Sequence, residues 1–504
     1  MSKIQRDADR TPVIIGVGQI SDRPADDAQG LDSLGLIRAA LAAAEHDVGT
    51  TCGRLDWLGV VDQISFPDPD IHRHLASALP RCPTHITRTR DASGDGPVKL
   101  LNDAANAIGR GEVAIAAAVG AEALRTASKR SQVRPESNSI GARNSLLEAA
   151  DALASPLARQ YGLLTPADVY PLYENATRSA WGQSLASAQA ESAAIWSGFS
   201  RTAAANPYAW LRREVPAELI ARPSTENRMI SFPYTKLMVA NASVNQGAAV
   251  IVASLAKARE LGIAPERLVY VGAGAAAHED PDFLRRESFT EPASLKTTIR
   301  RSLHFNGLDA SQLNLVELYS CFPCIPKMAR RELGWPLDRS HSVYGGLTFG
   351  GGPIGNCMMH AIACMVDQLR GRAGNGLIVA NGGFATHSHS ILLTTHPTRP
   401  NLFPQDYDVQ AAAEAIRGSP PHLLDTYLGR GRIETYCVPY DRLGQPRFAT
   451  IVGRTSENAR FLAHVEKQNS RVLDFLTSGR CDPVGGQGQT RAGADGRVIW
   501  DSDS

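Results

Sequence analysis

Apolar and β-branched residues cluster in short runs along the first part of the chain, with longer alanine-rich stretches between them. The runs predict strands at residues 13–17, 58–64, 85–88 and 113–119. Apolar residues at helical spacing predict helices over residues 31–44 and 97–108. Pro97 falls in the first turn of the second helix, where its missing N–H breaks no helical hydrogen bond. This alternation predicts an α/β fold built in layers.

The same order of elements returns in the second half. Apolar runs predict strands at residues 268–272, 313–318, 377–380 and 390–395. Helices are predicted at residues 293–305, from Pro323 onward, and at residues 354–369. One order of strands and helices in both halves suggests an internal duplication, although the halves share no evident sequence identity. We therefore expect one half over residues 1–265 and the other over residues 266–405.

Between residues 125 and 235 the pattern becomes polar and helical. This stretch carries several aromatic residues: Tyr161, Tyr170, Tyr173, Trp181, Trp196, Tyr208 and Trp210. An excursion of this length inside a compact domain is usually functional, as a lid or a binding subdomain. We expect a helical domain inserted into the first half.

The pattern changes again past about residue 405. Residues 432–440 and 447–454 flank a turn and predict a β-hairpin, and residues 460–464 predict a third strand. The glycine-rich residues 484–496 are either a flexible tail or a last loop, with a closing strand at residues 498–500. A small separate β domain over residues 415–504 follows from this pattern.

Composition excludes several classes of function. The net charge of +1 creates no long-range field for a polyanion, so nucleic acid is not an expected partner. No apolar run reaches the ~20 residues that a membrane span requires. Eight cysteines in 504 residues form no disulfide framework, which favours a reduced cytoplasm, and the abundant Ala and Arg are typical of high-GC bacteria. Cys321 and Cys324 form a CxxC without a second ligand pair, so no metal is expected.

Two glycine-rich loops in the second half are the most specific motifs. Residues 344–355 read YGGLTFGGGPIG, and residues 380–384 read ANGGF. They resemble the thiolase patterns GGxxxxGHPxG and CxGGG. In this resemblance Gly352 stands where the family has its basic histidine, and Ala380 stands where it has its second cysteine.

Residues 91–97, DASGDGP, resemble the thiolase segment that carries the nucleophilic cysteine, with Ser93 in its place. Residues 119–122, VGAE, then resemble the family's GGxE. A serine hydroxyl needs an adjacent base to act as a nucleophile, and Gly352 cannot supply one. Asp95 is either such a base or, more simply, the cap of the following helix.

Residues 317–322, ELYSCF, resemble the HDCF loop of sterol-carrier-protein-type thiolases. Tyr319 replaces the histidine that helps to form the family's oxyanion hole. A phenol there can donate a hydrogen bond to a thioester oxygen or exchange a proton with substrate, or it can simply fill the space. Cys321 matches a cysteine that the family also has, and it is the nearest candidate thiol.

Residues after the second glycine loop complete the candidate site. His387 and His389 point to one face if they lie on a strand, as a structural pair or a replacement base. The resemblance implies catalytic roles for Ser93, Tyr319 and Cys321. It implies contacts with substrate at Gly352, Ala380, Asn381, Gly382 and His387.

The resemblance covers about residues 11–400, including residues 234–249, where the family's chain leaves its loop domain. The β region after it is similar to the additional domain of thiolase-like proteins type 1. This implies a thiolase-like αβαβα layered fold of two similar halves, an inserted helical loop domain and an appended OB-like domain. It also implies acyl-CoA as a substrate, no separate cofactor, and a monomer or a homodimer.

Three functions remain open. The first is an acyl-CoA acyltransferase, similar to acetyl-CoA acetyltransferases of lipid or steroid metabolism, with Ser93 or Cys321 carrying the acyl group. The second is a CoA-ester lyase similar to thiolase-like retro-aldolases, which needs no covalent nucleophile and can rely on Tyr319. The third is a protein that binds CoA or acyl-CoA without catalysis. Ordinary Claisen thiolase activity is not expected, because all four of its catalytic positions are replaced.

Overall fold

The computed structural model describes residues 7–50, 54–133 and 153–502. Part of the predicted insert, residues 134–152, lies outside the described residues, as do the first six residues of the chain. Within the described residues, no helix is both long and apolar enough to cross a membrane.

Nine of the described strands form one mixed sheet in the order β3-β2-β4-β7-β1-β8-β11-β10-β9. The first half contributes β1 (Pro12–Ser21), β2 (Trp57–Val60), β3 (His85–Arg88), β4 (Ile115–Ala123) and β7 (Asn245–Ser254). The second half contributes β8 (Val269–His278), β9 (Leu315–Leu318), β10 (Asn375–Gly382) and β11 (His387–Thr394). A short ladder that pairs Val13 with Tyr270 and Ile14 with Val269 joins the two halves.

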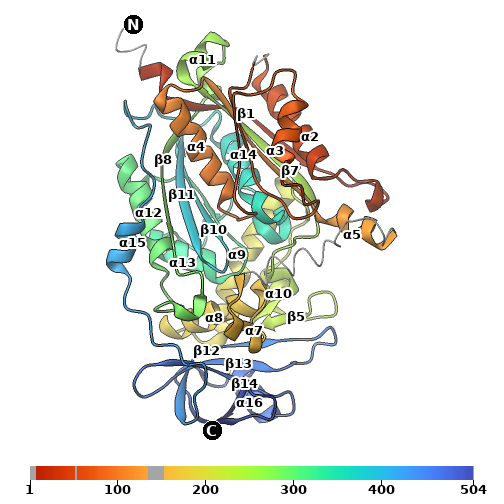
Figure 1. Cartoon of the computed structure of the whole chain (residues 1–504), viewed down its shortest axis with the longest axis vertical. Coiled ribbons are helices and arrows are strands. Elements are labelled where there is room, and N and C mark those ends of the chain that lie inside the picture. Colours follow the sequence, from red (N-terminus) through yellow and green to blue (C-terminus); the bar gives the residue numbers. More distant parts are fainter. Residues whose placement is uncertain (1–6, 51–53, 134–152, 503–504) are drawn as a thin grey trace.

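Helices lie between and outside the two halves of this sheet (Figure 1). The central layer consists of α4 (Gly96–Arg110) and α14 (Cys357–Leu369), which contact strands of both halves. The outer layers include α2 (Ser33–Val48) against β1 and β7, and α12 (Ala293–Asn306) against β8 and β11. Two shorter outer helices, α3 (Ile71–Ser77) and α13 (Cys324–Leu333), extend them. The predicted αβαβα layering is confirmed.

The inserted region is mainly helical, as predicted. Its helices are α5 (Leu124–Val133), α7 (Pro156–Gln160), α8 (Pro166–Ala180), α9 (Leu185–Ala205) and α10 (Ala217–Ala221). It then forms two short strands, β5 (Met229–Phe232) and β6 (Tyr234–Thr235), which the sequence pattern did not predict. β5 pairs with the first strand of the C-terminal domain, so the insert and that domain share a sheet.

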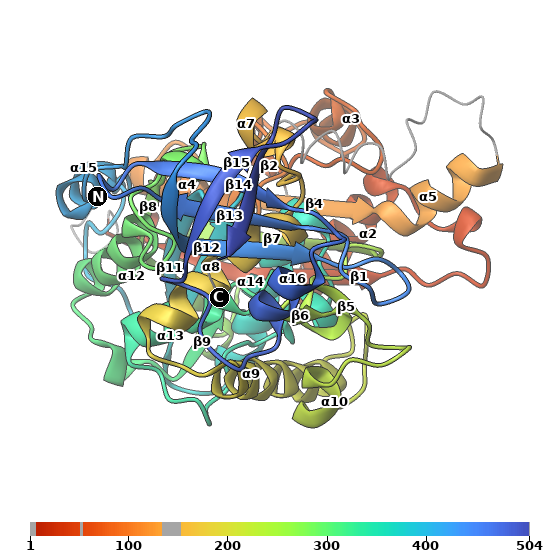
Figure 2. The same ribbon diagram turned by 90° about the horizontal axis from the view of Figure 1, so that it is seen from below.

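The C-terminal strands form a small barrel, seen from below in Figure 2. They are β12 (Arg430–Pro439), β13 (Ala449–Arg454), β14 (Arg460–Val465), β15 (Gln487–Ala492) and β16 (Val498–Ser502). Among the described strands the order β12-β13-β14-β16-β15 closes through pairing of β12 with both β13 and β15. The third and fifth strands run parallel, and α16 (Ser470–Thr477) lies between the third and fourth strands. This five-stranded barrel confirms the predicted OB-like domain.

The barrel is docked on the inserted helices through buried hydrogen bonds. The Tyr161 hydroxyl accepts the Val498 N–H at 2.9 Å, and the Thr450 hydroxyl donates to the Tyr161 carbonyl at 2.6 Å. The Asn175 side chain donates to the Tyr436 carbonyl at 2.9 Å. The segment that leads to the barrel, which includes α15 (Gln410–Ile416), first runs back along the edge of β8.

Candidate functional site

The turn between β3 and α4 holds the predicted nucleophile. The Gly96 N–H donates to the Ser93 carbonyl at 3.0 Å, which closes the turn immediately before the helix. Asp95 occupies the N-cap position, but its carboxylate makes no capping bond and instead accepts a short hydrogen bond from the Ser93 hydroxyl. The interpretation of Asp95 as a side-chain helix cap is therefore wrong.

Glycines allow the second glycine loop to approach this turn closely. A Cβ atom at Gly382 would overlap the Ser93 hydroxyl and the Asp95 carboxylate. A Cβ atom at Gly94 would overlap the Tyr319 hydroxyl and the Asn381 carbonyl. The structure thus brings Ser93, Tyr319, Asn381 and Gly382 together, although they come from three distant segments.

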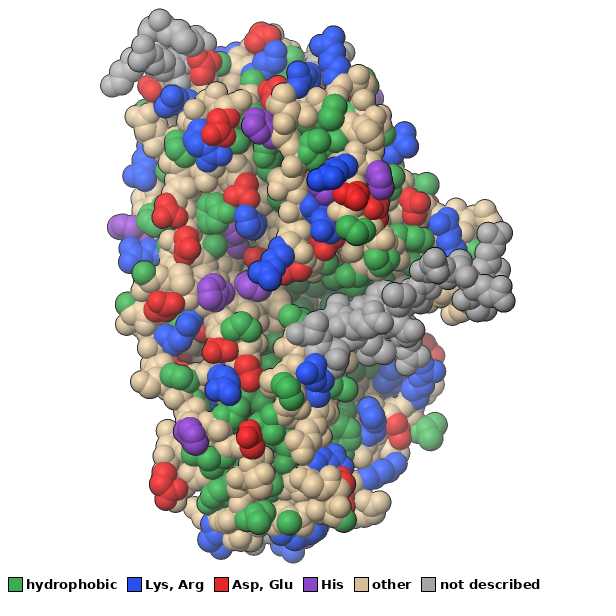
Figure 3. Space-filling model, in the orientation of Figure 1, with side chains coloured by type: hydrophobic (Ala, Val, Ile, Leu, Met, Phe, Trp, Pro, Cys, Tyr) green, Lys and Arg blue, Asp and Glu red, His purple; other side chains and the backbone are tan. Residues whose placement is uncertain are grey.

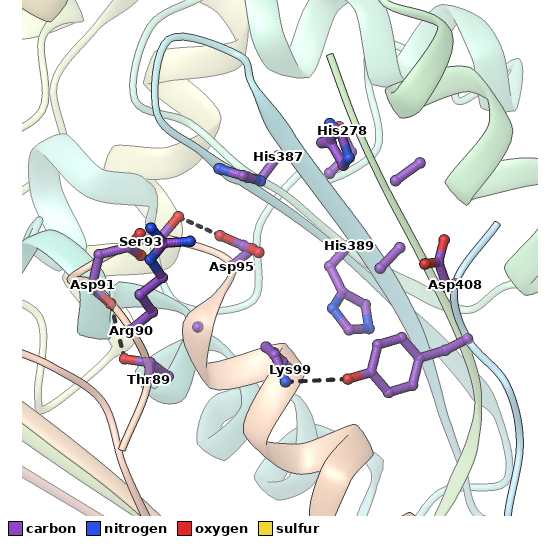
Figure 4. A pocket seen from close by; sticks show the side chains of 15 residues that line it. Thr89, Arg90, Asp91, Ser93, Asp95, Lys99, His278, His387, His389 and Asp408 are labelled. Carbon is purple, nitrogen blue, oxygen red and sulfur yellow. Dashed lines mark hydrogen bonds between the residues drawn. The ribbon is translucent and has the colours of Figure 1, made fainter. Parts of the chain in front are cut away.

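A cavity of about 280 Å³ opens beside Ser93 (Figure 4). Its titratable lining comes from three regions of the chain: Arg90, Asp91, Asp95 and Lys99 around the start of α4, His278, His387 and His389 from β8 and β11, and Tyr407 with Asp408 from the segment after the second half. His387 lies at the exposed rim, whereas His389 is buried. Both histidines line this cavity, as expected for two residues on one face of a strand.

Burial sets the protonation of the groups around the cavity. It lowers the pKa of His389 to about 4, so this imidazole is neutral at pH 7. Its Nε2 lies 3.3 Å from the Asn102 Oδ1. Burial and then the Asp95 charge raise the pKa of Asp91. Burial and the neighbouring Asp103 raise the pKa of Tyr407 to about 12, so this phenol stays protonated.

Tyr319 and Cys321 lie deeper, away from the lining of this cavity. Tyr319 is buried against the Cys357 thiol at the start of α14, and burial raises the pKa of its phenol well above the usual range. Burial also raises the pKa of Cys321 to about 12, beside the hydroxyl of Tyr170. At neutral pH Tyr319 is therefore a hydrogen-bond donor, and Cys321 is a thiol with almost no thiolate.

Gly352 and Ala380 are fully enclosed by protein and do not line the cavity beside Ser93. The Gly352 N–H donates to the Asn241 carbonyl at 2.9 Å, and a Cβ atom there would lie 3.2 Å from that oxygen. Ala380 pairs with His389 across β10 and β11. The predicted site residues therefore fall into two groups. Ser93, Gly382 and His387 lie at or next to the cavity. The others are buried outside its lining: Tyr319, Cys321, Gly352, Ala380 and Asn381.

Several cavity residues were not identified from the sequence. Asp91 and Lys99 flank Ser93 closely enough in sequence that this proximity is a usable signal. Tyr407 contacts Lys99 from 308 residues further along the chain, which no local pattern indicates. It reaches the cavity because residues 407–409 pair with the edge of β8 at Ala276. Among the described residues, no group of three His, Cys, Asp or Glu side chains is arranged to hold a metal ion.

A second cavity, of about 450 Å³, lies between the inserted region and the layered core. Its lining includes Trp210 and three cations, Arg125, Arg213 and Lys236, against one carboxylate, Glu226. The guanidinium carbons of Arg23 and Arg125 lie 4.8 Å and 5.9 Å from the centre of the Trp210 ring. Figure 3 shows Lys and Arg side chains gathered near α10 and β5, at the right edge of the molecular face that is drawn. Cations beside an aromatic ring suit an anionic ligand with a flat ring.

This cavity also reaches the first glycine loop. Asn241 and Thr348 line it. The Asn241 carbonyl accepts the N–H of Gly352, and the Thr348 hydroxyl accepts the Trp196 indole N–H at 2.9 Å. One wall of the cavity is therefore formed by the first glycine loop and the residue bonded to it.

Comparisons with known proteins agree with this architecture. The family described as "Thiolase-like protein type 1 additional C-terminal domain" matches residues 408–497. No curated protein sequence matches the chain. A solved structure of a monomeric SCP2-thiolase-like protein type 1 from Mycobacterium smegmatis is similar, with 28% identity over 98% of this chain and 99% of that chain and a TM-score of 0.82.

Two further solved structures share the fold of the layered core. The Ltp2-ChsH2(DUF35) aldolase has 20% identity over 77% of this chain and 98% of that chain, with a TM-score of 0.60. Human mitochondrial 3-ketoacyl-CoA thiolase in complex with CoA has 15% identity over 77% and 98%, with a TM-score of 0.57. These likenesses confirm the predicted thiolase-like fold.

Proposed function

Because this chain belongs to the thiolase-like proteins of type 1, we propose that it is an acyl-CoA acyltransferase in which Ser93 carries the acyl group. The observation that supports this most directly is the hydrogen bond from the Ser93 hydroxyl to the Asp95 carboxylate beside an open cavity. A serine becomes a useful nucleophile when an adjacent base accepts its proton. Asp95 would act as the base in place of the thiolase histidine, because Gly352 stands at the position of that histidine.

The proposed transfer has two steps. The Ser93 oxygen attacks the thioester carbonyl while the Asp95 carboxylate accepts the hydroxyl proton, and the C–S bond then breaks. CoA leaves as a thiol with that proton, and the acyl group stays on Ser93 as an ester. An acceptor hydroxyl, thiol or amine next attacks the ester and regenerates the serine. The N-terminal end of α4 favours the negative charge that develops at Ser93.

The second cavity is the proposed site for the CoA moiety. Arg213 and Lys236 supply charge for its phosphates, and Trp210 supplies a flat surface for a ring. Asn241, in the wall of this cavity, is bonded to Gly352 of the first glycine loop. The thioester end is then directed toward the loops that pack around Ser93.

Retro-aldol cleavage of a CoA ester is the second candidate. It is favoured by Tyr319, whose phenol stays protonated and packs against Gly94 next to Ser93. Such a reaction needs a base for a hydroxyl proton and a donor that stabilises an enolate, but no covalent nucleophile. The third candidate is a protein that binds acyl-CoA without catalysis. It would bind CoA esters but neither become acylated nor turn them over.

Intact-protein mass after rapid quenching tests these functions. The protein is mixed with short-chain, long-chain and steroidal acyl-CoAs, alongside Ser93→Ala and the control Ser388→Ala, which changes another serine of the same cavity. Acyltransfer predicts an acyl-sized gain in the wild type and Ser388→Ala, absent in Ser93→Ala. An unchanged mass at every quench time, with CoA release that Ser93→Ala leaves intact, rejects the acyltransferase. Loss of turnover of 3-hydroxyacyl-CoA esters in Tyr319→Phe alone would then support the lyase.

A further inference from the structure

The turn at the end of the second glycine loop, residues 382–386, has a strained backbone at Ala385. Gly383 and Ala385 both have left-handed backbone angles, with φ of 61° and 57°. This region suits glycine but not alanine, so the surroundings must hold Ala385 there. The Tyr170 hydroxyl accepts the Ala385 N–H at 3.1 Å, and the Thr386 N–H donates to the Gly382 carbonyl at 2.8 Å.

The Arg286 side chain holds the same turn. Its guanidinium is buried and donates to the Phe384 carbonyl at 2.6 Å, the Ala385 carbonyl at 3.2 Å and the Thr386 hydroxyl at 2.8 Å. It also donates to the Tyr173 hydroxyl at 2.5 Å. One side chain therefore satisfies three groups of the turn and ties it to α8. The conformation of the turn depends on where the backbone of Arg286 lies.

The appended barrel sets the position of that backbone. The Arg460 side chain is completely buried and donates to the Leu284 and Arg286 carbonyls, each at 2.6 Å. The Glu434 carboxylate fixes this guanidinium with bonds of 2.6 Å and 2.8 Å. The same guanidinium lies over the Phe289 ring, 4.9 Å from its centre. A barrel side chain thus reaches through the interface to hold the segment that carries Arg286.

We infer that Arg460 and Glu434 are positioning residues through which the appended barrel shapes the site around Ser93. The contacts run from Arg460 to the Arg286 backbone, from the Arg286 side chain to residues 384–386, and from Gly382 to Ser93 and Asp95. This inference rests on the proposed function where it concerns Ser93. The structural step, from Arg460 of the barrel through Arg286 to residues 384–386, does not rest on the proposed function.

A purely stabilising role accounts less well for these contacts. Burying an ion pair costs desolvation that its attraction often only offsets, so the pair is weak evidence for stability. The guanidinium of Arg460 nevertheless directs three of its bonds to carbonyls of the layered core, those of Leu284, Arg286 and Glu287. Such directed bonds fix geometry. Lysine at position 460 keeps the charge but cannot make the same fork of bonds.

Hydrogen exchange of the full chain tests the structural step. Arg460→Lys is compared with the wild type and with Arg491→Lys, which alters an exposed barrel arginine paired with Asp501. We expect the amides of Ala385 and Thr386 to exchange about tenfold faster or more in Arg460→Lys, while β13 and β14 stay within about twofold. Unchanged exchange at these two amides in a folded Arg460→Lys protein overturns the inference. If that variant does not fold, Glu434→Gln is measured in its place with the same criteria.

The rate of Ser93 acylation tests the consequence for the site. In Arg460→Lys we expect the rate at saturating acyl-CoA to fall about tenfold or more, with the half-saturating concentration within about twofold of the wild type. Equal rates together with faster exchange at Ala385 would overturn the link to Ser93. If the wild type is never acylated, the proposed function fails, and the exchange measurement alone still decides the positioning role.

Discussion

The Ser93 hydroxyl donates a hydrogen bond to the carboxylate of Asp95, two residues along the chain. This bond lies in the turn at the start of α4. By the sequence resemblance, Ser93 stands there in place of the nucleophilic cysteine of thiolases. Under the proposed function, the Asp95 carboxylate would supply the base that Gly352 cannot supply. Nucleophilic attack by Ser93 would then need no base from the first glycine loop.

Asp95→Asn should slow acylation of Ser93 by about 100-fold or more, because an amide can accept the hydrogen bond but cannot take the proton. Stopped-flow quench and mass measurement give the rate. Asp103→Asn, on the same helix but bonded to Lys99 and Tyr407, is the matched control and should retain most of the rate. Equal rates for Asp95→Asn and the wild type would remove Asp95 from the mechanism.

Gly382→Ala should abolish acylation while leaving a folded protein, because the new methyl group would occupy the space of the Ser93 and Asp95 side chains. The turn would have to move apart, and small displacements of reacting groups are costly in rate. Gly198→Ala is the control, since its Cβ meets only Arg201 at 3.7 Å. In a helix that change should add roughly 0.5–1 kcal/mol of stability. Thermal unfolding and acylation, measured together, separate the two effects, and an active Gly382→Ala protein would contradict the geometry.

Cys321 should be inert toward alkylation in the folded protein. Its pKa of about 12 leaves almost no thiolate at pH 8, and the side chain is buried. Iodoacetamide followed by peptide mapping should label the exposed Cys82 and Cys481 and leave Cys321 unmodified. Unfolding in urea should make all three react. Rapid labelling of Cys321 in the native protein would show a reactive thiolate, and Cys321 would again be a candidate nucleophile.

The layered fold could be predicted because its strands are buried on both faces. β4 is buried along its whole length, so its apolar run is visible in the sequence. β15 could not be predicted, because only alternate residues such as Gly488 and Thr490 are buried and the rest are polar. β15 is a strand because it pairs with β12 and β16 when the barrel closes. This pairing depends on the whole domain and leaves no local pattern in the sequence.

The candidate site could be predicted only where its residues share a motif. Ser93 and Gly382 each lie in a recognisable loop, and their contact follows from the fold. The sequence leaves Asp95 open as a base or a helix cap, because the N-cap position alone does not say which donor a carboxylate accepts from. Tyr407 reaches the cavity through the pairing of its segment with β8, which depends on the edge of a sheet formed by distant residues.

The stability of the protein should depend on Glu317 at neutral pH. Burial raises its pKa to about 8, while its carboxyl accepts bonds from the Ser342 hydroxyl at 2.7 Å and the Val343 N–H at 2.9 Å. The folded pKa exceeds the unfolded value of about 4.5, so the folded protein holds a proton that the unfolded chain loses between these values. This contribution is complete below pH ~4.5 and is lost as pH rises toward 8.

Glu317→Gln should keep both accepted bonds and remove this pH dependence. Relative to the variant, the wild type should lose on the order of 4 kcal/mol of unfolding free energy between pH 4.5 and pH 8. Urea unfolding of both proteins across that range measures the difference. Glu414→Gln, an exposed change on α15, should parallel the wild type. Parallel curves for Glu317→Gln and the wild type would show that the carboxyl is ionised in the fold.

Binding of CoA should depend on the cations of the second cavity. Arg213 and Lys236 line it with exposed side chains, and neither forms an ion pair with another described residue. Their charge is therefore available to a phosphate, and each lost contact should weaken CoA binding by about 3- to 30-fold. The loss should shrink at high salt, because added ions screen exposed charges. The Debye length is ~8 Å at physiological ionic strength and shortens as salt is added.

Calorimetric titration of CoA into Arg213→Gln, Lys236→Gln and the control Lys467→Gln measures this dependence. Lys467 lies on the barrel within 3.9 Å of Asp441 and away from the cavity lining, so its loss should leave affinity unchanged. Dephospho-CoA, which lacks the terminal 3′-phosphate, should show a smaller penalty from whichever cation contacts that group. If all three variants bind CoA like the wild type, the ligand does not occupy this cavity. The acyl-CoA would then have to reach Ser93 from the cavity lined by His387 and Lys99.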